Sequence, residues 1–389
     1  MDVIELTKDL ISYNSTSAIS NIEIADFLTE QLTALHFEIE RIEYEDENNV
    51  RKVNLVAKKG KVCPDCIGIN SAIPRIGRGD GIALLGHTDA VPAEGWDFDP
   101  FSAFIEGGKL YGRGSSDMKG AIACMLCAVE QFRDAEFIHP CYLFFTSDEE
   151  IGCGGAKAIA RTSQMFHQSH PRYGVIGEPT SLRVINSHKG AVLFIATAKG
   201  KAAHSSTGRG VNANLKMIPF LSEMRNIYEM LTTNEEYFNR AFDPPFSDWN
   251  IGVNDGNTPP NVTAPLSRCT INFRPMPGHD TDAFITKVQE VAKQHDIEVE
   301  VRRYGEPLLT PIDSQIVQTA LELTGEKETG TVPYGTDALA LGSQMELILI
   351  GPGDITQSHT VGEWVEIDQL YKAIDIYGKF IKKFCIETL

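Results

Sequence analysis

Four short apolar runs in this chain each lead into acidic or histidine residues, and this pattern constrains the fold more than any other. The runs are residues 82–85, 141–145, 173–176 and 347–350. Each has the length and composition of a buried strand. In open α/β sheets, ligands bind beyond the carboxyl ends of the strands. The sequence therefore predicts an α/β sheet with polar side chains gathered at one edge.

The helices expected between these strands, and one interruption of their order, predict two domains. Amphipathic patterns predict helices over residues 2–13, 21–35, 314–323 and 367–384. Between residues 191 and 306 the expected order is strand, helix, strand, strand, helix and strand, a compact α+β unit of ferredoxin-like type. We therefore expect an α/β domain over 1–186 and 307–389, with an inserted domain over 187–306.

The charge of the chain limits the partners it can have. Asp and Glu number 53 against 35 Lys and Arg, which gives a formal net charge of −18. Such an acidic chain is a poor ligand for nucleic acid or an anionic membrane. No apolar run reaches the roughly 18 residues that a membrane span needs. The first residues lack the basic and apolar regions of a signal peptide, which favours a cytoplasmic location.

The eight cysteines are expected to be reduced thiols rather than a disulfide framework. Cys63 and Cys66 form a CxxC motif, but no second pair follows with the spacing of a zinc ribbon. They fall within residues 60–81, a Gly- and Ile-rich stretch that we interpret as a loop insertion.

Histidine and acidic residues at these ends of elements could bind a pair of metal ions. The candidate ligands are His87, Asp117, Glu150, Glu178 and His359. Their nitrogen and oxygen atoms suit Zn²⁺ or Co²⁺, and Mn²⁺ is also compatible. Three carboxylates carry a charge of about −3, which two divalent ions and a bridging hydroxide would balance. Two ions close together need a shared carboxylate, and Asp117 is our choice.

Two of these positions also have simpler interpretations. Asp117 is predicted to open a helix, and Asp at a helix start is usually an N-cap. His87 ends a strand and is equally compatible with a structural role. Asp89, two residues further on, is on the same face of the strand and can hold the imidazole in one tautomer, as the outer carboxylates of metal sites do.

Glu149 is the candidate general base. It neighbours Glu150, and adjacent side chains point in different directions, so one can bind metal while the other faces the reacting water. Glu149 would take the proton of that water and pass it to a leaving amine. The predicted reaction class is metal-assisted amide hydrolysis.

Five motifs extend this pattern. They are His87-Thr88-Asp89, Gly112-Arg113-Gly114 with Asp117-Met118-Lys119-Gly120, Asp148-Glu149-Glu150, Gly177-Glu178-Pro179-Thr180 and the late His359. Together they resemble the M20 metallopeptidase family over nearly the whole chain. Residues 176–182, 210–213 and 351–359 are most similar to the acetylornithine deacetylases of that family.

The resemblance implies a zinc-peptidase-like catalytic domain, a mixed sheet flanked by helices, with an inserted lid domain through which the protein forms a homodimer. It implies that one zinc ion binds His87, Asp117 and Glu178, and that the other binds Asp117, Glu150 and His359. Glu149 matches the family's base, and Asp89 matches the acid that supports the metal site.

Further residues are assigned by the resemblance alone. His204 matches a lid histidine that reaches an active site, often that of the partner subunit, where it would stabilise the oxyanion. Asn261 and Arg274 match positions that bind the substrate carboxylate, a task that suits an Arg fork. Gly335 and Thr336 match substrate-binding positions. His204 as a surface-loop histidine and Arg274 as a surface ion-pair partner remain alternatives.

The implied activity is hydrolysis of N2-acetyl-L-ornithine to ornithine and acetate, a step of arginine biosynthesis. One departure concerns the substrate: Asp337 stands where those deacetylases have Glu. The shorter acid would shift the preference either toward a longer amine, such as acetyl-lysine, or toward another acyl amino acid. Other M20 activities remain alternatives, namely succinyl-diaminopimelate desuccinylase, aminoacylase and dipeptidase. A metal-binding protein without catalysis is the alternative of a different class.

Overall fold

The computed structural model describes residues 1–62 and 81–387 as two compact units. Unit 1 comprises Met1–Asn186, Thr310–Gly330 and Thr336–Leu389, and unit 2 comprises Ser187–Leu309 and Thr331–Gly335. Cys63, Cys66 and most of the predicted insertion over 60–81 lie outside the described residues.

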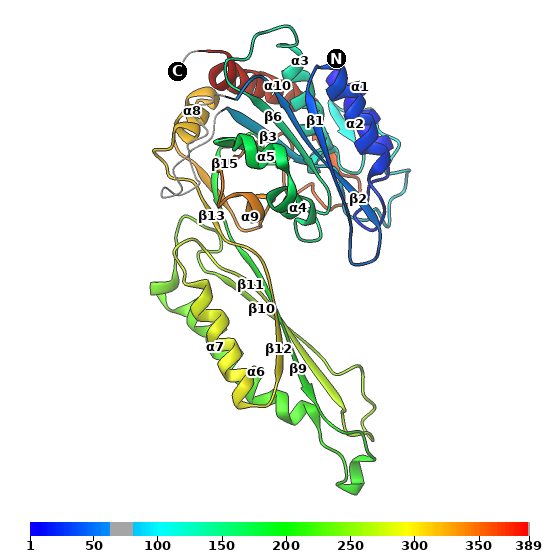
Figure 1. The fold of residues 1–389 in the computed structure, drawn as a ribbon. Helices are drawn as coiled ribbons and strands as arrows, with labels where there is room; N and C mark the ends of the chain where they lie inside the picture. The colour runs from blue at the N-terminus through cyan, green and yellow to red at the C-terminus, as the bar shows by residue number, and fades with distance from the viewer. Residues whose placement is uncertain (63–80, 388–389) are drawn as a thin grey trace. The chain divides into compact units, whose positions relative to one another are not determined.

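Unit 1 is built on a mixed sheet with the strand order β1-β2-β6-β3-β7-β15-β8 (Figure 1). Strands β6, β3, β7 and β15 run parallel, whereas β1 and β2 are antiparallel to their neighbours. The strands are β1 (Glu38–Glu45), β2 (Arg51–Lys59), β3 (Ile82–His87), β6 (Cys141–Thr146), β7 (Tyr173–Ile176), β8 (Ile185–His188) and β15 (Glu346–Leu349). The predicted buried strands therefore form the parallel centre of the sheet.

Helices cover both faces of this sheet, and the side chains of β6 show why. Cys141, Leu143 and Phe145 belong to the main hydrophobic core, while Phe144 packs edge-on against Phe166 of α5 on the other face. Side chains alternate along a strand, so an apolar run without polar interruption must be buried on both sides. The helices of unit 1 are α1 (Val3–Ser12), α2 (Ile22–Ala34), α3 (Gly120–Glu130), α4 (Gly154–Thr162), α5 (Gln164–Ser169), α8 (Gln315–Thr324), α9 (Ala338–Leu341) and α10 (Ile367–Ile381), with the wide terminal turns η2 (Ser115–Lys119) and η5 (Lys382–Ile386).

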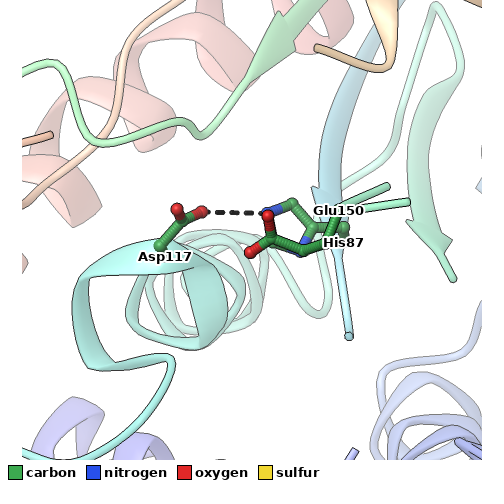
Figure 2. Close-up of side chains that lie close together, drawn as sticks. All are labelled: His87, Asp117 and Glu150. Carbon is green, nitrogen blue, oxygen red and sulfur yellow. Dashed lines mark hydrogen bonds and ion pairs between the residues drawn. The ribbon is translucent and has the colours of Figure 1, made fainter. Parts of the chain in front are cut away.

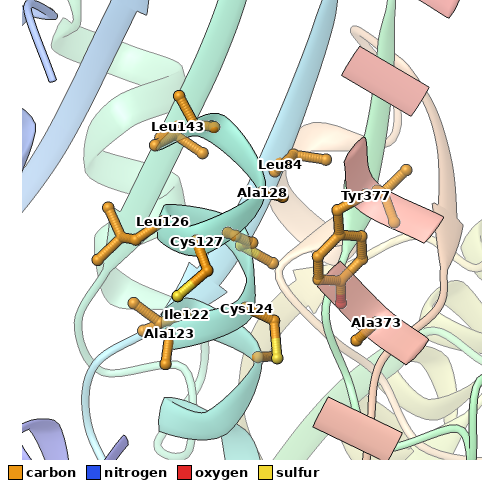
Figure 3. Close-up of a cluster of buried hydrophobic side chains, with 14 of the residues drawn as sticks. Leu84, Ile122, Ala123, Cys124, Leu126, Cys127, Ala128, Leu143, Ala373 and Tyr377 are labelled. Atoms are coloured by element: carbon orange, nitrogen blue, oxygen red, sulfur yellow. The ribbon is translucent and has the colours of Figure 1, made fainter. Parts of the chain in front are cut away.

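Helix α3 lies in the middle of the main core. All its residues from Gly120 to Val129 are buried, and Figure 3 shows Cys124 of α3 on the side of the helix that faces Tyr377 and Ala373 of α10. The prediction that this helix begins at Asp117 is wrong. The helix begins at Gly120, because Asp117 has non-helical backbone angles (φ −124°, ψ 91°).

Unit 1 also contains a second, small sheet. It has the antiparallel order β16-β5-β4 and joins residues from distant parts of the sequence. Its strands are β4 (Phe104–Glu106), β5 (Lys109–Tyr111) and β16 (Trp364–Glu366). Strand β5 runs directly into the turn that carries Asp117, so this sheet fixes the position of that turn.

Unit 2 has the predicted α+β composition. Its antiparallel sheet has the order β10-β11-β9-β12, which is that of a ferredoxin-like βαββαβ unit, and α6 and α7 pack together on it (Figure 1). Asn212 and Asp280 cap the two helices by accepting hydrogen bonds from Asn214 N and Ala283 N. The elements are β9 (Ala191–Lys199), η3 (Ser205–Thr207), α6 (Ala213–Thr233), η4 (Glu235–Tyr237), β10 (Asp248–Asn254), β11 (Leu266–Arg274), α7 (Thr281–Gln294), β12 (Glu298–Gly305) and β13 (Leu308–Leu309); β14 (Gly330–Val332) crosses the boundary between the units.

The helices do not provide a membrane span. Within residues 1–62 and 81–387, none is both long enough and apolar enough to cross a bilayer.

Candidate metal centre

His87 is held by one interaction on each side of its ring. Its Nδ1 atom lies 2.9 Å from the backbone oxygen of Asp89, and its Nε2 atom lies 3.0 Å from Oδ1 of Asp117 (Figure 2). A carbonyl oxygen can only accept, so Nδ1 carries the proton and donates it there. A carboxylate oxygen also only accepts, so Nε2 carries a second proton and donates it to Asp117. When that proton leaves, the lone pair of Nε2 becomes available to a metal ion at this position.

The carboxylate of Asp89 has a different position from the one that we expected. Its Oδ1 atom is 3.7 Å from Nδ1 of His87. The carboxylate instead accepts hydrogen bonds from the backbone of residues 148–150, the acidic loop that follows β6. The donors are Glu149 N at 3.1 Å and Glu150 N at 3.3 Å, and Ser17 Oγ donates to the same carboxylate at 2.8 Å. Asp89 thus orients the His87 ring with its backbone and the acidic loop with its side chain.

Asp117 lies between the two histidines. Its Oδ1 atom contacts Nε2 of His87, and its Oδ2 atom is 3.4 Å from Nε2 of His359. The residue is 6% exposed, so this carboxylate is shielded from bulk water. A carboxylate with one oxygen directed at each of two ligand sets has the geometry that a shared ligand of two ions requires.

Glu150 and His359 complete this side of the cluster. Oε2 of Glu150 is 2.9 Å from Nε2 of His359, whereas its buried Oε1 atom has no hydrogen-bond partner in the described part of the chain. Ligand atoms of His87, Asp117 and Glu150 all lie within 4.8 Å of one another. The side chain of His359 is 52% exposed, so the cluster reaches the surface of unit 1 on that side.

Two glycines allow the ligand-bearing strands to approach α3 closely. Gly86 precedes His87, and Gly177 precedes Glu178. A Cβ atom at Gly86 would lie 2.8 Å from Ile122, and one at Gly177 would lie 2.6 Å from Met125, closer than side chains can pack. Glu178 is buried at the end of β7, and its charge interacts with Asp117 and Glu150.

The ionisation of the carboxylates follows from burial and crowding. Burial raises the pKa of Glu149, Glu150 and Glu178, and neighbouring carboxylates raise these pKa values further. Burial also opposes ionisation of Asp117, but its hydrogen bonds to His359 and His87 lower its pKa. In such a cluster, protons must balance part of the negative charge.

The pKa values of the two histidines are also raised, which favours their positively charged forms. Burial alone would lower the pKa of His87, but its hydrogen bond to Asp117 and the nearby carboxylates raise it. Hydrogen bonds to Asp117 and Glu150 raise the pKa of His359 to about 10. The cluster therefore favours cations strongly. Two divalent ions would balance this charge without protons, and the unpartnered Oε1 atom of Glu150 is free to bind one, so the residues fit a metal centre.

Glu149 lies in a second group with Cys153 and Asp337, whose polar atoms are within 4.8 Å of one another. Oδ2 of Asp337 accepts a hydrogen bond of 2.6 Å from Thr146 Oγ1, and burial raises the pKa of Asp337 to about 6. Thr336 is fully buried next to this group in unit 1, whereas Gly335 belongs to unit 2.

The remaining predicted residues lie in unit 2. His204 is exposed, and its Nδ1 atom is 2.7 Å from Oγ of Ser206. Asn261 is its neighbour, because Ser205 N donates to Asn261 O at 2.9 Å. Arg274 ends β11 and is partly buried. The structure thus groups His204 with Asn261 and separates both from Arg274.

Sequence reasoning missed two buried or partly buried side chains, Lys52 and Tyr44, that hold the acidic loop through Asp148. Lys52 of β2 is 1% exposed, and its Nζ atom lies 2.7 Å from Oδ1 of Asp148. Tyr44 donates to the other oxygen of Asp148 at 2.6 Å, and Nζ of Lys52 also donates to the backbone oxygen of Ser17. No local signal distinguishes this lysine, because it follows Arg51 near the start of a strand that ends in two further lysines.

Solved structures of other proteins have the same architecture. An M20 family metallo-carboxypeptidase from Sulfolobus solfataricus superposes with a TM-score of 0.74 at 18% identity, covering 99% of both chains. A dinuclear metal-binding M20 peptidase from Bacillus subtilis superposes with a TM-score of 0.66 at 16% identity, covering 97% of this chain and 96% of that one. At these identities the likeness establishes the fold, a mixed sheet flanked by helices.

Curated sequences extend the comparison to closer relatives. The acetylornithine deacetylase of Myxococcus xanthus is 30% identical over 97% of this chain and 96% of its own length. That of Proteus mirabilis is 31% identical over 88% and 92%. The model of peptidase family M20/M25/M40 matches residues 83–383. This family of metallopeptidases uses divalent metal ions, and its members are hydrolases that cleave amide bonds. With that match over most of its length, and with candidate metal ligands at the strand ends, the chain belongs to peptidase family M20/M25/M40.

Proposed function

We propose that the protein hydrolyses N2-acetyl-L-ornithine to ornithine and acetate, a step of arginine biosynthesis. The observation that carries the reaction class is the convergence of ligand atoms from His87, Asp117 and Glu150 next to the partly buried side chain of Glu149. The relatives named acetylornithine deacetylase, which match nearly the whole chain, support the substrate.

The proposed centre would hold two divalent ions, most suitably zinc, with cobalt and manganese as alternatives. His87, Asp117 and Glu178 would hold one ion, and Asp117, Glu150 and His359 would hold the other. The position of Asp117 between the two imidazoles supports its role as the shared ligand. When bound, such ions acidify water and polarise an acyl carbonyl.

In this proposal Glu149 takes the proton of the attacking water and delivers it to the amine that leaves. The backbone N–H of Glu149 is fixed by Asp89, so the loop holds the side chain in one place. His204 donates a hydrogen bond to the oxyanion of the tetrahedral intermediate. Asn261 and Arg274 bind the substrate carboxylate, and Gly335 and Thr336 line the substrate site.

We further propose a homodimer in which unit 2 acts as the lid and dimerisation domain, with domain bounds of 187–306 for the lid and 1–186 with 307–389 for the catalytic domain. Asn261 precedes the first residue of β11, and His204 lies beside it at that end of the strand. Arg274 is the last residue of β11, at the opposite end. One small substrate that touches all three must therefore take them from two copies of unit 2. A symmetric dimer supplies both copies.

The proposed compartment is the cytoplasm. Cys124, Cys127, Cys141, Cys153 and Cys269 are buried thiols, as in proteins of a reducing compartment.

Acetyl-lysine is the second candidate substrate. Asp337 is one methylene shorter than the Glu expected at this position, and its carboxylate lies beside that of Glu149. The shorter side chain leaves room for a longer amine.

A panel of acylated amino acids tests these assignments. The metal-reconstituted enzyme would be given acetylornithine, acetyl-lysine, succinyl-diaminopimelate, acetylmethionine and a dipeptide, and kcat/KM would be measured for each. We expect acetylornithine to have the highest value. If it is turned over no faster than acetylmethionine or the dipeptide, the assigned substrate is wrong, although the reaction class would stand.

A further inference from the structure

Glu363 is a completely buried carboxylate that points at the backbone of the turn carrying Asp117. Its Oε1 atom accepts hydrogen bonds from Ser116 N and Asp117 N, both at 2.9 Å. Its Oε2 atom accepts from Gly114 N at 3.0 Å and from Arg113 Nη1 at 2.7 Å. Four donors from residues 113–117 therefore converge on the carboxylate of Glu363, and one of these residues, Asp117, is a candidate metal ligand.

The backbone around Glu363 fixes the distance to this turn. Gly112 N donates to the backbone oxygen of Glu363 at 3.0 Å, and Trp364 pairs with Tyr111 in the antiparallel ladder of β16 and β5. These hydrogen bonds fix the position of Gly112, where the turn begins, relative to Glu363. Because Asp117 is not helical, a helix cannot satisfy its N–H, and the carboxylate supplies the missing acceptor.

Arg113 extends the same network to the other side of the metal centre. Its Nη2 atom donates to the backbone oxygens of Thr360 and Pro92, each at 3.3 Å, while Nη1 contacts Glu363. Thr360 follows His359 directly. The guanidinium, which is 3% exposed, therefore connects Glu363 to the loop that carries the second histidine.

We propose that Glu363 is a positioning residue of the metal centre, which sets Asp117 through the backbone of residues 114–117 and sets His359 through Arg113. The inference rests on the proposed dinuclear centre. Its geometric basis is that both oxygens of Glu363 accept hydrogen bonds, and that the two segments it holds carry Asp117 and His359, whose Oδ2 and Nε2 atoms lie 3.4 Å apart.

The substitution Glu363→Gln separates this role from packing, because Gln has nearly the same shape. Its amide has one acceptor oxygen, and its NH₂ group can only donate. One pair of donors would therefore face another donor, either Ser116 N and Asp117 N or Gly114 N and Arg113. Buried donors left without an acceptor would push the turn away from the position seen here.

The test measures metal binding without substrate. Metal-free protein would be titrated with Zn²⁺ in a calorimeter, with a competing chelator to bring the affinities into range. We expect Glu363→Gln to bind Zn²⁺ about 10- to 100-fold more weakly than the wild type, the usual effect of losing a group that orients ligands. Glu366→Gln is the matched control, because Glu366 lies three residues further along and is exposed.

Hydrogen exchange followed by mass spectrometry provides a second readout. The amides of residues 114, 116 and 117 should exchange faster in Glu363→Gln than in the control, with other segments unchanged. A folded Glu363→Gln protein that keeps wild-type zinc affinity would overturn the proposal. A wild-type protein that binds no divalent ion would instead refute the metal centre of the proposed function.

Arg113→Lys tests the connection to His359 and remains available if Glu363→Gln does not fold. Lysine keeps the charge, but its single ammonium group cannot reproduce the fork that reaches Glu363, Pro92 and Thr360 together. We expect weaker binding of the ion assigned to His359 and retention of the other, so that zinc content falls toward one ion per chain. Unchanged affinity for both ions would refute the connection through Arg113.

Discussion

Mixing two inactive variants can decide whether His204 acts in the active site of its own chain or in that of a partner. One chain carries Glu149→Ala, which removes the proposed base, and the other carries His204→Ala, which removes the proposed oxyanion donor. The two chains would be produced with different affinity tags, and the heterodimer would be isolated by two successive purifications.

The reason to expect action between subunits is the length of β11. From Leu266 to Arg274 the chain makes eight steps, and at about 3.4 Å per residue these ends are roughly 27 Å apart. His204 bridges to Val262, shortly before the first of these residues, so it lies at the far end from Arg274. An acetylated amino acid is much shorter than this separation.

The heterodimer would then contain one complete site and one doubly damaged site. The complete site combines Glu149 from the His204→Ala chain with His204 from the Glu149→Ala chain. We expect about half of the wild-type turnover per dimer, while each parent homodimer has almost none. The assay is kcat with acetylornithine, and wild-type chains carrying the same two tags are the control.

If His204 acts within its own chain, neither site of the heterodimer is complete. Turnover no higher than that of the parent variants would therefore refute the reasoning, as would sedimentation of the wild-type protein as a monomer. His204 is exposed, so His204→Ala should have the same melting temperature as the wild type.

Three further predictions concern the base, the buried network and the metal. Glu149→Ala should lower kcat by about 10²–10⁴-fold with metal content unchanged, and loss of metal in elemental analysis would make Glu149 a ligand instead. Lys52→Met leaves the carboxylate of Asp148 without its buried cation and should cost about 3–5 kcal/mol of unfolding free energy in urea; a cost below about 1 kcal/mol would contradict the assigned ion pair. Chelation of the metal should lower the melting temperature, because ions free at 100 times their dissociation constant add about 2.7 kcal/mol of stability, and an identical melting temperature with and without chelator would argue against a bound metal.

The sequence indicated the central strands because their signal is local. Residues 82–85 and 141–145 are apolar without interruption, so they had to be buried on both faces, and the structure places them side by side as β3 and β6. The same reasoning missed β8, because Ile185–His188 is mostly polar and yet buried. Its burial depends on neighbours that the local pattern does not contain.

The sequence predicted which residues form the site, but not which atoms of these residues contact one another. His87 and Glu150 were expected at one edge because parallel strands end together there, and the structure brings their ligand atoms within 4.8 Å. The role of Asp89 could not be foreseen, because its carboxylate accepts from a loop that follows a different strand. Asp117 was assigned to a helix start, since nothing in its local pattern reveals its non-helical backbone.

Local sequence patterns were enough to predict the layers of the fold and the kind of chemistry at the strand ends, because apolar periodicity and the order of polar residues act over a few neighbouring positions. Which oxygen faces which donor depends on contacts between distant parts of the chain, and these exist only in the folded protein. Glu363 and Ser116 are 247 residues apart, and in the sequence Glu363 resembles any acid near a surface turn. Its importance arises from folding, which buries a carboxylate where three backbone N–H groups and the guanidinium of Arg113 converge.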